Sequence, residues 1–454
     1  MKKAWERIDA IIGFEIDQRH EEGCIVDEAL MARIASARQQ NHEQQLHLLM
    51  EELARLKPTS SFPFREPDGL AAIRAARPDG PRRCKLDHDV DILHRIHGGW
   101  LGRTAGCALG KPVEKWSMQM INEYLEYYDA LPLDNYIPAG KGFPKDHDSQ
   151  YFIRGDDCTR GNITHMPRDD DMDYTVLGLH TLEHYGYEFT SVDAGFTWID
   201  RLPYNLLYTA ERIAYCNLIN DLNPPASAET ENPFREWIGA QIRADIWGYV
   251  TPGWPEKAAE FAYRDATISH TKNGVYGAMF FAAVLAASFS TGDVKQLISI
   301  GLSEIPENCR LADAIRDTMH WSESYDDWQQ TWSRINEKYG HYSTVHTINN
   351  AALVIMGLLY GQGDFERTIV TTVLGGWDAD CTGATAGSVI GLILGADALP
   401  EKWVGVFNDQ LKSAVRGSQD CRISDLTQRT HQIALDILKS HQSHSIKPEN
   451  EIDS

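Results

Sequence analysis

The stretch "GGWDADCTGATAGSVIGLILGADALPEKW" at residues 375–403 places two aspartates, Asp378 and Asp380, directly before a series of regularly spaced glycines. A glycine stands at every fourth position, at Gly383, Gly387, Gly391 and Gly395. This spacing puts the glycines on one side of a helix. Because each interior glycine costs about 1 kcal/mol relative to alanine, the sequence predicts a helix that another part of the chain approaches very closely.

A second glycine series has the same spacing. The segment "HGGWLGRTAGCALG" at residues 97–110 carries Gly98, Gly102, Gly106 and Gly110. By analogy with the small-xxx-small motifs of membrane helices, we predict that the two glycine faces pack against each other. The alternative is that each face accommodates a bulky side chain from some other helix.

Composition and charge limit the class of protein. The chain has 454 residues, 43% of them hydrophobic and 24% charged, which is typical of a soluble globular protein with one large domain or two smaller ones. The formal net charge of −22 disfavours nucleic acid and anionic lipid as partners. The charged N-terminus lacks the apolar core of a secretory signal, and residues 383–396 are too short to span a membrane. We therefore expect a cytoplasmic protein whose eight scattered cysteines are reduced.

The chain divides into three predicted parts. Residues 1–90 form an N-terminal helical extension and linker, residues 91–440 the main domain, and residues 441–454 a disordered polar tail. Two helical stretches are expected within residues 1–56, and the second carries Leu46, Leu49 and Leu53 on one face. The linker is the Pro- and Ser-rich segment "KPTSSFPFREPDG".

Helical periodicity dominates the main domain, and strand-like alternation is hard to find, so we predict an all-α fold. The candidate helices are 94–110, 173–186, 204–220, 234–247, 255–268, 275–290, 346–360, 364–374, 382–395 and 423–439. A long irregular region at 129–168 is of the kind that covers functional sites.

Acidic residues stand at the ends of three predicted helices. Asp378 and Asp380 precede the second glycine series, Glu114 follows the first, and Asp169, Asp170 and Asp171 open another helix. A single aspartate there commonly caps a helix. Three adjacent carboxylates repel one another unless a cation compensates them. Oxygen ligands without histidine suit Mg²⁺, Mn²⁺ or Ca²⁺, so the spacing suggests either a dinuclear site of hard metal ions or a solvated acidic surface.

The order of three motifs is informative. "GGWLGRTAGCALGKPVE", then "DDDMDYT", then "GGWDADCTGATAGSVIG" resembles the ADP-ribosylglycohydrolase family over about residues 91–410. The resemblance implies an all-α, orthogonally packed multi-helix bundle whose central cleft holds two Mg²⁺ or Mn²⁺ ions. It also implies cleavage of a bond to the anomeric carbon of an ADP-ribosyl group.

The family's site residues transfer by motif. Glu114 matches the glutamate after the first motif, Asp378 and Asp380 match the aspartates of the third, and the second pair is Asp169–Asp170 or Asp170–Asp171. The family threonine before that pair is replaced by Arg168 or Asp169. Cys381 replaces the last threonine of the third motif, so Thr382 or water is expected to take over. The predicted metal ligands are Asp169, Asp170, Asp171, Asp378, Asp380 and Thr382, and the predicted catalytic residues are Glu114 and Asp170.

The function implied by the resemblance is hydrolysis of a glycosidic bond by water. The substrate is expected to be either an ADP-ribosylated protein or a small molecule such as a nucleoside or an ADP-ribose derivative. Two alternatives stay open at this point: a sensor that binds ADP-ribose or a nucleotide without catalysis, and a Mg²⁺-dependent phosphohydrolase.

Overall fold

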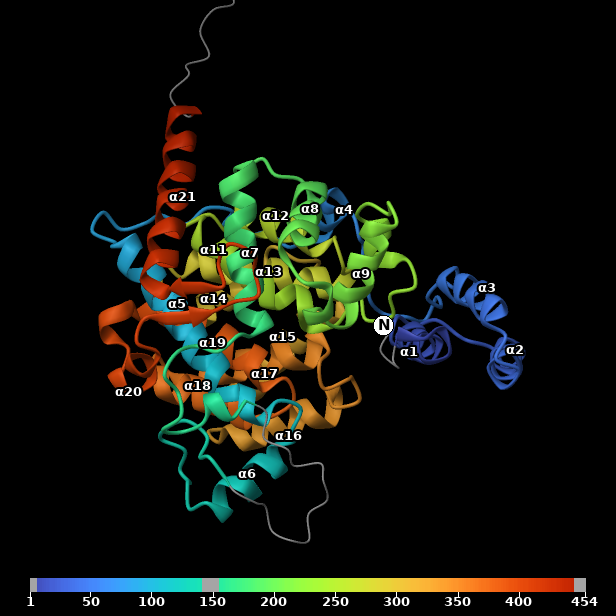
Figure 1. The fold of residues 1–454 in the computed structure, drawn as a ribbon, viewed down its shortest axis with the longest axis horizontal. Coiled ribbons are helices and arrows are strands. Elements are labelled where there is room, and N and C mark those ends of the chain that lie inside the picture. Colours follow the sequence, from blue (N-terminus) through green and yellow to red (C-terminus); the bar gives the residue numbers. More distant parts are fainter. Residues whose placement is uncertain (1–5, 141–154, 445–454) are drawn as a thin grey trace, which may run out of the picture.

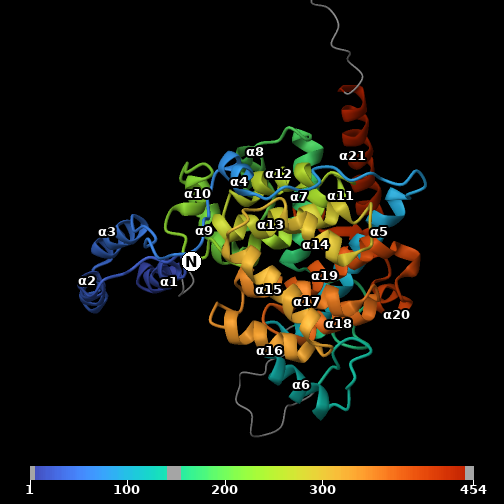
Figure 2. The same cartoon turned by 180° about the vertical axis from the view of Figure 1, so that it is seen from behind.

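The computed structural model describes residues 6–140 and 155–444. The fold is all-α, as predicted, and Figures 1 and 2 show helices on both sides of the molecule. Within the described residues the strands are β1 (Gln410–Lys412) and β2 (Asp420–Arg422), which form a small antiparallel pair. No described helix is long and apolar enough to cross a membrane.

The two glycine helices form the centre of the molecule. They are α5 (Ile92–Gly110) and α19 (Ala379–Leu394). A Cβ atom added to Gly102 would lie 2.1 Å from the carbonyl oxygen of Gly387, and one added to Gly106 would lie 1.9 Å from that of Gly383. The backbones therefore touch where the glycines meet. The predicted pairing of the two glycine faces is confirmed, and the alternative of a bulky side chain against each face is wrong.

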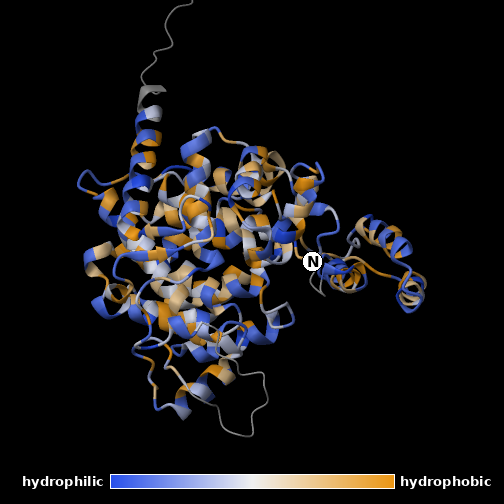
Figure 3. Cartoon of the chain, in the orientation of Figure 1, coloured by the Kyte–Doolittle hydropathy of each residue, from blue (hydrophilic) through white to orange (hydrophobic). Residues whose placement is uncertain are grey.

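Other helices surround this central pair. α17 (Thr347–Gly361) and α18 (Phe365–Leu374) pack on α19, and α21 (Ile423–His444) packs on α5. The remaining helices of the body include α7 (Asp170–Tyr185), α9 (Thr209–Ile219), α11 (Asp245–Tyr249), α12 (Pro255–Ala266) and α13 (Lys272–Ala287). Hydrophilic and hydrophobic residues mix along α21 (Figure 3), as in a helix that buries one side, whereas α13 is buried from Asn273 to Ala287.

Most of the predicted helices are present, but residues 234–247 are not one continuous helix. A 3₁₀ helix at Ile238–Arg243 is followed by the short α11. The backbone amide of Ile238 donates to the carbonyl of Val345, and that of Thr271 donates to the carbonyl of Arg235. Because this segment hydrogen-bonds to distant parts of the chain, it does not complete a regular α-helix.

Several further helices were not predicted. They are α4 (Leu70–Ala76), α6 (Met118–Tyr127), α8 (Ser191–Arg201), α10 (Ala226–Glu229), α14 (Val294–Leu302), α15 (Arg310–Ser324), α16 (Trp328–Tyr339) and α20 (Glu401–Val404). α21 also continues through His444, into the predicted tail, while residues 445–454 lie outside the described residues. Of the irregular region 129–168, residues 141–154 lie outside the description as well.

The N-terminal extension contains three helices before the linker: α1 (Ile8–Glu21), α2 (Glu28–Gln39) and α3 (Glu43–Ala54). The second predicted stretch is broken where Asn41 takes a left-handed backbone conformation, with φ of 51°. Leu46, Leu49 and Leu53 are buried on one face, as predicted. Figures 1 and 2 show the three helices projecting from the body beside α9.

Buried ion pairs hold the extension against the body. Arg235 donates from Nη1 to Glu15 at 2.7 Å and from Nη2 to Glu22 at 2.8 Å, and all three side chains are almost fully buried. Lys272 adds a second cation 2.8 Å from Glu22. Because an unpaired buried charge is strongly destabilising, these contacts keep α1 in one position.

The contact between the two glycine helices predicts contrasting effects of alanine substitutions. We expect Gly102→Ala to lower the free energy of unfolding by about 3 kcal/mol or more, because its methyl group has no space beside Gly387. Gly13→Ala in α1 should instead raise it by up to about 1 kcal/mol, because nothing lies within 4 Å of the added Cβ. Urea unfolding of both variants measures the contrast, and equal effects would contradict the packing described.

Candidate functional site

A cavity of about 550 Å³ opens where three helix ends meet. Its polar lining comes from the end of α5, the start of α7 and the start of α19. The acidic and basic residues in this part are Lys111, Glu114, Lys115, Arg168, Asp169, Asp170, Asp378 and Asp380. The predicted acidic clusters therefore converge on one space, because the contact between the glycine helices brings the end of α5 to the start of α19.

The two aspartates of α19 do not cap their helix. Asp378 occupies the N-cap position, but its side chain accepts no capping hydrogen bond; its backbone amide donates to Asn350 Oδ1 at 3.2 Å. Asp380 is 6% exposed, and its Oδ1 atom is buried with no hydrogen-bond partner among the described residues. Helix capping therefore does not explain why Asp378 and Asp380 stand at the start of α19.

Glu114 is brought next to these aspartates by a backbone clamp. The amide of Lys115 donates to the carbonyl of Trp377 at 2.7 Å, and the amide of Trp377 donates to the carbonyl of Trp116 at 2.8 Å. Lys115 and Trp377 both adopt left-handed backbone conformations, with φ of 69° and 59°. Such strain in non-glycine residues costs about 1–3 kcal/mol and concentrates at functional sites. Here it lies directly beside Glu114 and Asp378.

The three aspartates at the start of α7 have different environments. Asp169 caps the helix by accepting from the amide of Asp171 at 3.0 Å, and it also pairs with Lys111 Nζ at 2.8 Å. Asp171 is buried and lies 3.2 Å from the guanidinium of Arg103, which also pairs with Asp245. Asp170 lines the cavity. Of the three, Asp169 thus has a structural role as a cap as well as its place in the cavity wall.

Burial and mutual repulsion shift the pKa values of these carboxyl groups. Burial, followed by the charge of Glu114, raises the pKa of Asp378 to about 7 and that of Asp380 well above its usual range. Burial and the neighbouring Asp169 also raise the pKa of Asp170. Burial works in the same direction on Asp169, but the ammonium of Lys111 outweighs it and lowers the pKa. The site therefore binds protons that a divalent cation would displace.

Glu114, Asp378 and Asp380 offer the donor set best suited to a hard cation. One carboxylate oxygen from each of the three lies within 4.8 Å of the other two. Such an all-oxygen set fits Mg²⁺ or Mn²⁺, and the unpartnered oxygen of Asp380 is consistent with a missing ligand there. A second group combines Asp171, Asp380 and Cys381. Its thiol is a poorer donor for such ions, because burial raises the pKa of Cys381 well above its usual range.

The predicted ligands differ in how they face the cavity. Asp169, Asp170, Asp378 and Asp380 line it, whereas Asp171 and Thr382 do not. The hydroxyl of Thr382 points to the carbonyl of Ala379 in its own helix, at 3.4 Å. Cys381, which replaces the family threonine, lines the cavity instead. The metal-binding roles of all six residues stay predictions.

Several residues of the site were not predicted. Arg103 and Lys111 supply the cations that pair with Asp171 and Asp169. The sequence does contain a signal for Arg103, because it stands among glycines and apolar residues of a predicted buried helix. A charged side chain in such a place needs a buried partner of opposite charge. Glu211 and the aromatic residues Phe14, Tyr208, Phe234 and Trp237 also line the cavity. They come from distant parts of the chain, and no motif marks them.

The all-α fold gathers its carboxylates around one cavity, which defines a helical protein with an acidic site. The sequence model of the ADP-ribosylglycohydrolase family matches residues 88–441, and the chain belongs to that family of glycohydrolases. A solved structure named "ADP-ribosylglycohydrolase-related protein complex" is 17% identical, with a TM-score of 0.48. The match covers 76% of this chain and 99% of that one. None of the curated proteins matches the chain.

The buried carboxylates predict how the protein responds to metal. We expect Asp380→Asn to raise the melting temperature of the metal-free protein. A buried carboxyl whose pKa is raised by burial, Glu114 and Asp378 lowers stability at neutral pH, because it must either stay charged or take up a proton on folding. The same variant should lose most of the stabilisation that Mg²⁺ or Mn²⁺ gives the unmodified protein.

Differential scanning fluorimetry with and without the ions measures both effects. The exposed Asp326→Asn is the matched control, and it should change neither value. A variant of Asp380 that is still stabilised by metal to the full extent would show that this carboxylate is not a ligand.

Proposed function

We propose that the protein is a divalent-metal-dependent hydrolase that cleaves the bond at the anomeric carbon of an ADP-ribosyl group or of a related N-riboside. The observation that supports this most directly is the position of Asp380. Its carboxylate has a buried oxygen without a partner among the described residues, and it lies beside Asp378 and Glu114 at the cavity. An arrangement that costs so much stability is expected where binding or catalysis needs it.

Two Mg²⁺ or Mn²⁺ ions are the proposed cofactors. One would be held by Glu114, Asp378 and Asp380, and the other between Asp380 and the aspartates that open α7. Bound there, such ions would polarise a water molecule and fix the hydroxyl groups of a ribose. Because Thr382 points away from the cavity and Cys381 is a poor donor for these ions, water completes the coordination in this proposal.

Glu114 and Asp170 are the proposed catalytic residues. Both line the cavity: Glu114 follows the end of α5, and Asp170 opens α7. Either carboxylate can accept a hydrogen bond from the attacking water and direct its oxygen at the anomeric carbon. The water's oxygen bonds to that carbon, the glycosidic bond breaks, and the proton passes to the leaving group. The acidic wall stabilises the positive charge that develops on the sugar in the transition state.

The direct test is a mass-spectrometric assay with Mg²⁺ or Mn²⁺. The substrates are ADP-ribosyl-arginine, an ADP-ribosyl-serine peptide, O-acetyl-ADP-ribose and a set of nucleosides. We expect release of a free ribose end from at least one of them, and a loss of more than about 100-fold in the Asp378→Asn/Asp380→Asn variant, since ligand carboxylates matter at least as much as their supporting residues.

The exposed Asp326→Asn serves again as the control and should retain full turnover. Release of inorganic phosphate instead of a ribose end would identify a phosphohydrolase and contradict the proposal. Tight binding of ADP-ribose without turnover of any substrate would also contradict it and indicate a sensor.

A further inference from the structure

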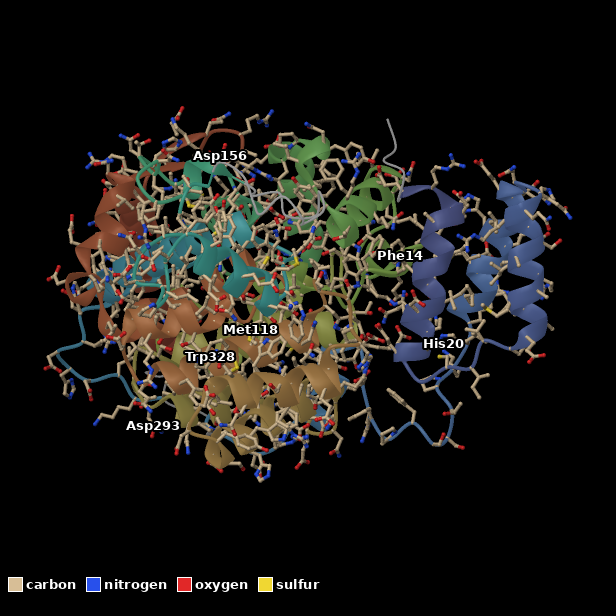
Figure 4. All side chains as sticks on the ribbon, turned by 90° about the horizontal axis from the view of Figure 1, so that it is seen from below. Phe14, His20, Met118, Asp156, Asp293 and Trp328 are labelled. Atoms are coloured by element: carbon tan, nitrogen blue, oxygen red, sulfur yellow. The ribbon has the colours of Figure 1, made fainter. Side chains whose placement is uncertain are left out.

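The N-terminal extension contributes a residue to the cavity that holds the catalytic carboxylates. Phe14 lies in the middle of α1, lines the cavity and is 38% exposed. Figure 4 shows it on the side of α1 that faces the body. The family match begins at residue 88, so this part of the cavity wall comes from outside the shared domain.

Phe14 belongs to a group of aromatic residues in the cavity lining that come from other segments of the chain than Asp170, Asp378 and Asp380. Its ring centroid is 5.0 Å from that of Phe234 and 6.1 Å from that of Trp237, which it meets edge to face. Phe234 and Trp237 are themselves 4.5 Å apart. Tyr208 adds a fourth ring to the lining and Ile238 an aliphatic side chain. The cavity is thus lined by carboxylates and by aromatic side chains, and Glu211 adds a further carboxylate beside Gly239.

The position of Phe14 is fixed by the charges beside it. Glu15 follows Phe14 in α1, Arg235 follows Phe234, and these two charged residues form the buried ion pair described above. The ion pair and the ring contact therefore join adjacent residues of the same two segments: Glu15 to Arg235, and Phe14 to Phe234. A side chain held in this way can present its face to a ligand without being ordered on binding, which reduces the entropic cost of that binding.

The two kinds of side chain in the lining, carboxylate and aromatic, define the ligand. Carboxylates and bound cations suit the hydroxyl groups of a sugar, and aromatic rings that are partly exposed in a cavity suit a flat ring that stacks on them. We propose that Phe14 and Trp237 bind a planar heteroaromatic ring of the substrate, such as a purine, and that the extension thereby selects ribosides that carry one. This inference rests on the proposed function, because it places the sugar at Glu114, Asp378 and Asp380.

The planar ring has two possible sources with the same chemistry. In a nucleoside it is the leaving group itself, whereas in an ADP-ribosyl compound it is the adenine at the far end of the molecule. Adenosine and ADP-ribose therefore serve as separate probes, and ribose 5-phosphate is the probe without a ring.

The test compares the unmodified protein with Phe14→Ala, Phe14→Tyr and Phe196→Ala, by calorimetry and by steady-state kinetics. Phe196 is another exposed phenylalanine, on α8 and outside the cavity lining, and is the matched control. We expect Phe14→Ala to weaken binding of adenosine or ADP-ribose about tenfold and to raise KM by a similar factor with kcat unchanged. Ribose 5-phosphate should bind equally to all variants, and Phe14→Tyr should restore ring binding.

Each outcome has a defined meaning. A tenfold effect on adenosine alone supports the inference with the ring as leaving group, and an effect on ADP-ribose alone supports it with the ring at the far end. Unchanged affinity of Phe14→Ala for both ring-bearing probes overturns it, as does the failure of both probes to bind the unmodified protein. Ring binding that depends on Phe14 in a protein without turnover overturns the proposed function and leaves this inference intact.

Discussion

The contact between the backbones of α5 and α19 determines where everything else in the site can lie. Helices with side chains at their interface pack with axes about 8–10 Å apart. Glycine at the contact removes the side chains, so the carbonyl of Gly387 lies where a Cβ of Gly102 would stand. At the end of α5, Gly110 likewise meets the backbone of Ala379. Glu114 follows a few residues later, so this close approach places it beside Asp378 and Asp380.

The cavity brings several carboxylates together, and only some of them are paired with a cation of the chain. On the side of α7, Arg103 and Lys111 pair with Asp171 and Asp169, so these charges are satisfied within the chain. On the side of α19, raised pKa values and an unpartnered oxygen show that Asp378 and Asp380 are not. Asp170, at the start of α7, also has a raised pKa and lines the cavity, so carboxyl groups that the chain does not neutralise face the cavity from both helices.

Much of this arrangement follows from the sequence. The glycine spacing alone predicts two helices in close contact, and the order of the acidic motifs predicts which helix ends carry the site.

The spacing does not predict Phe14, because its place in the cavity depends on pairing between Glu15 and Arg235 across a long separation in the chain. Local periodicity also fails for residues 234–247, where hydrogen bonds to Val345 and Thr271 replace those of a helix. A shift of one residue on a helix turns the side chain by about 100°, so Cys381 lines the cavity and Thr382 does not.

The ion pairs that hold α1 have a consequence for the order in which the chain folds during synthesis. Glu15 and Glu22 leave the ribosome early, but Arg235 and Lys272 are made more than 200 residues later. Until then the two carboxylates have no counter-charge from the body, and α1 has only the helices of its own extension to pack against. Because domains fold largely from the N-terminus as they emerge, the extension is an exception that must wait for the body. The wall of the cavity that is synthesised first is therefore assembled among the last.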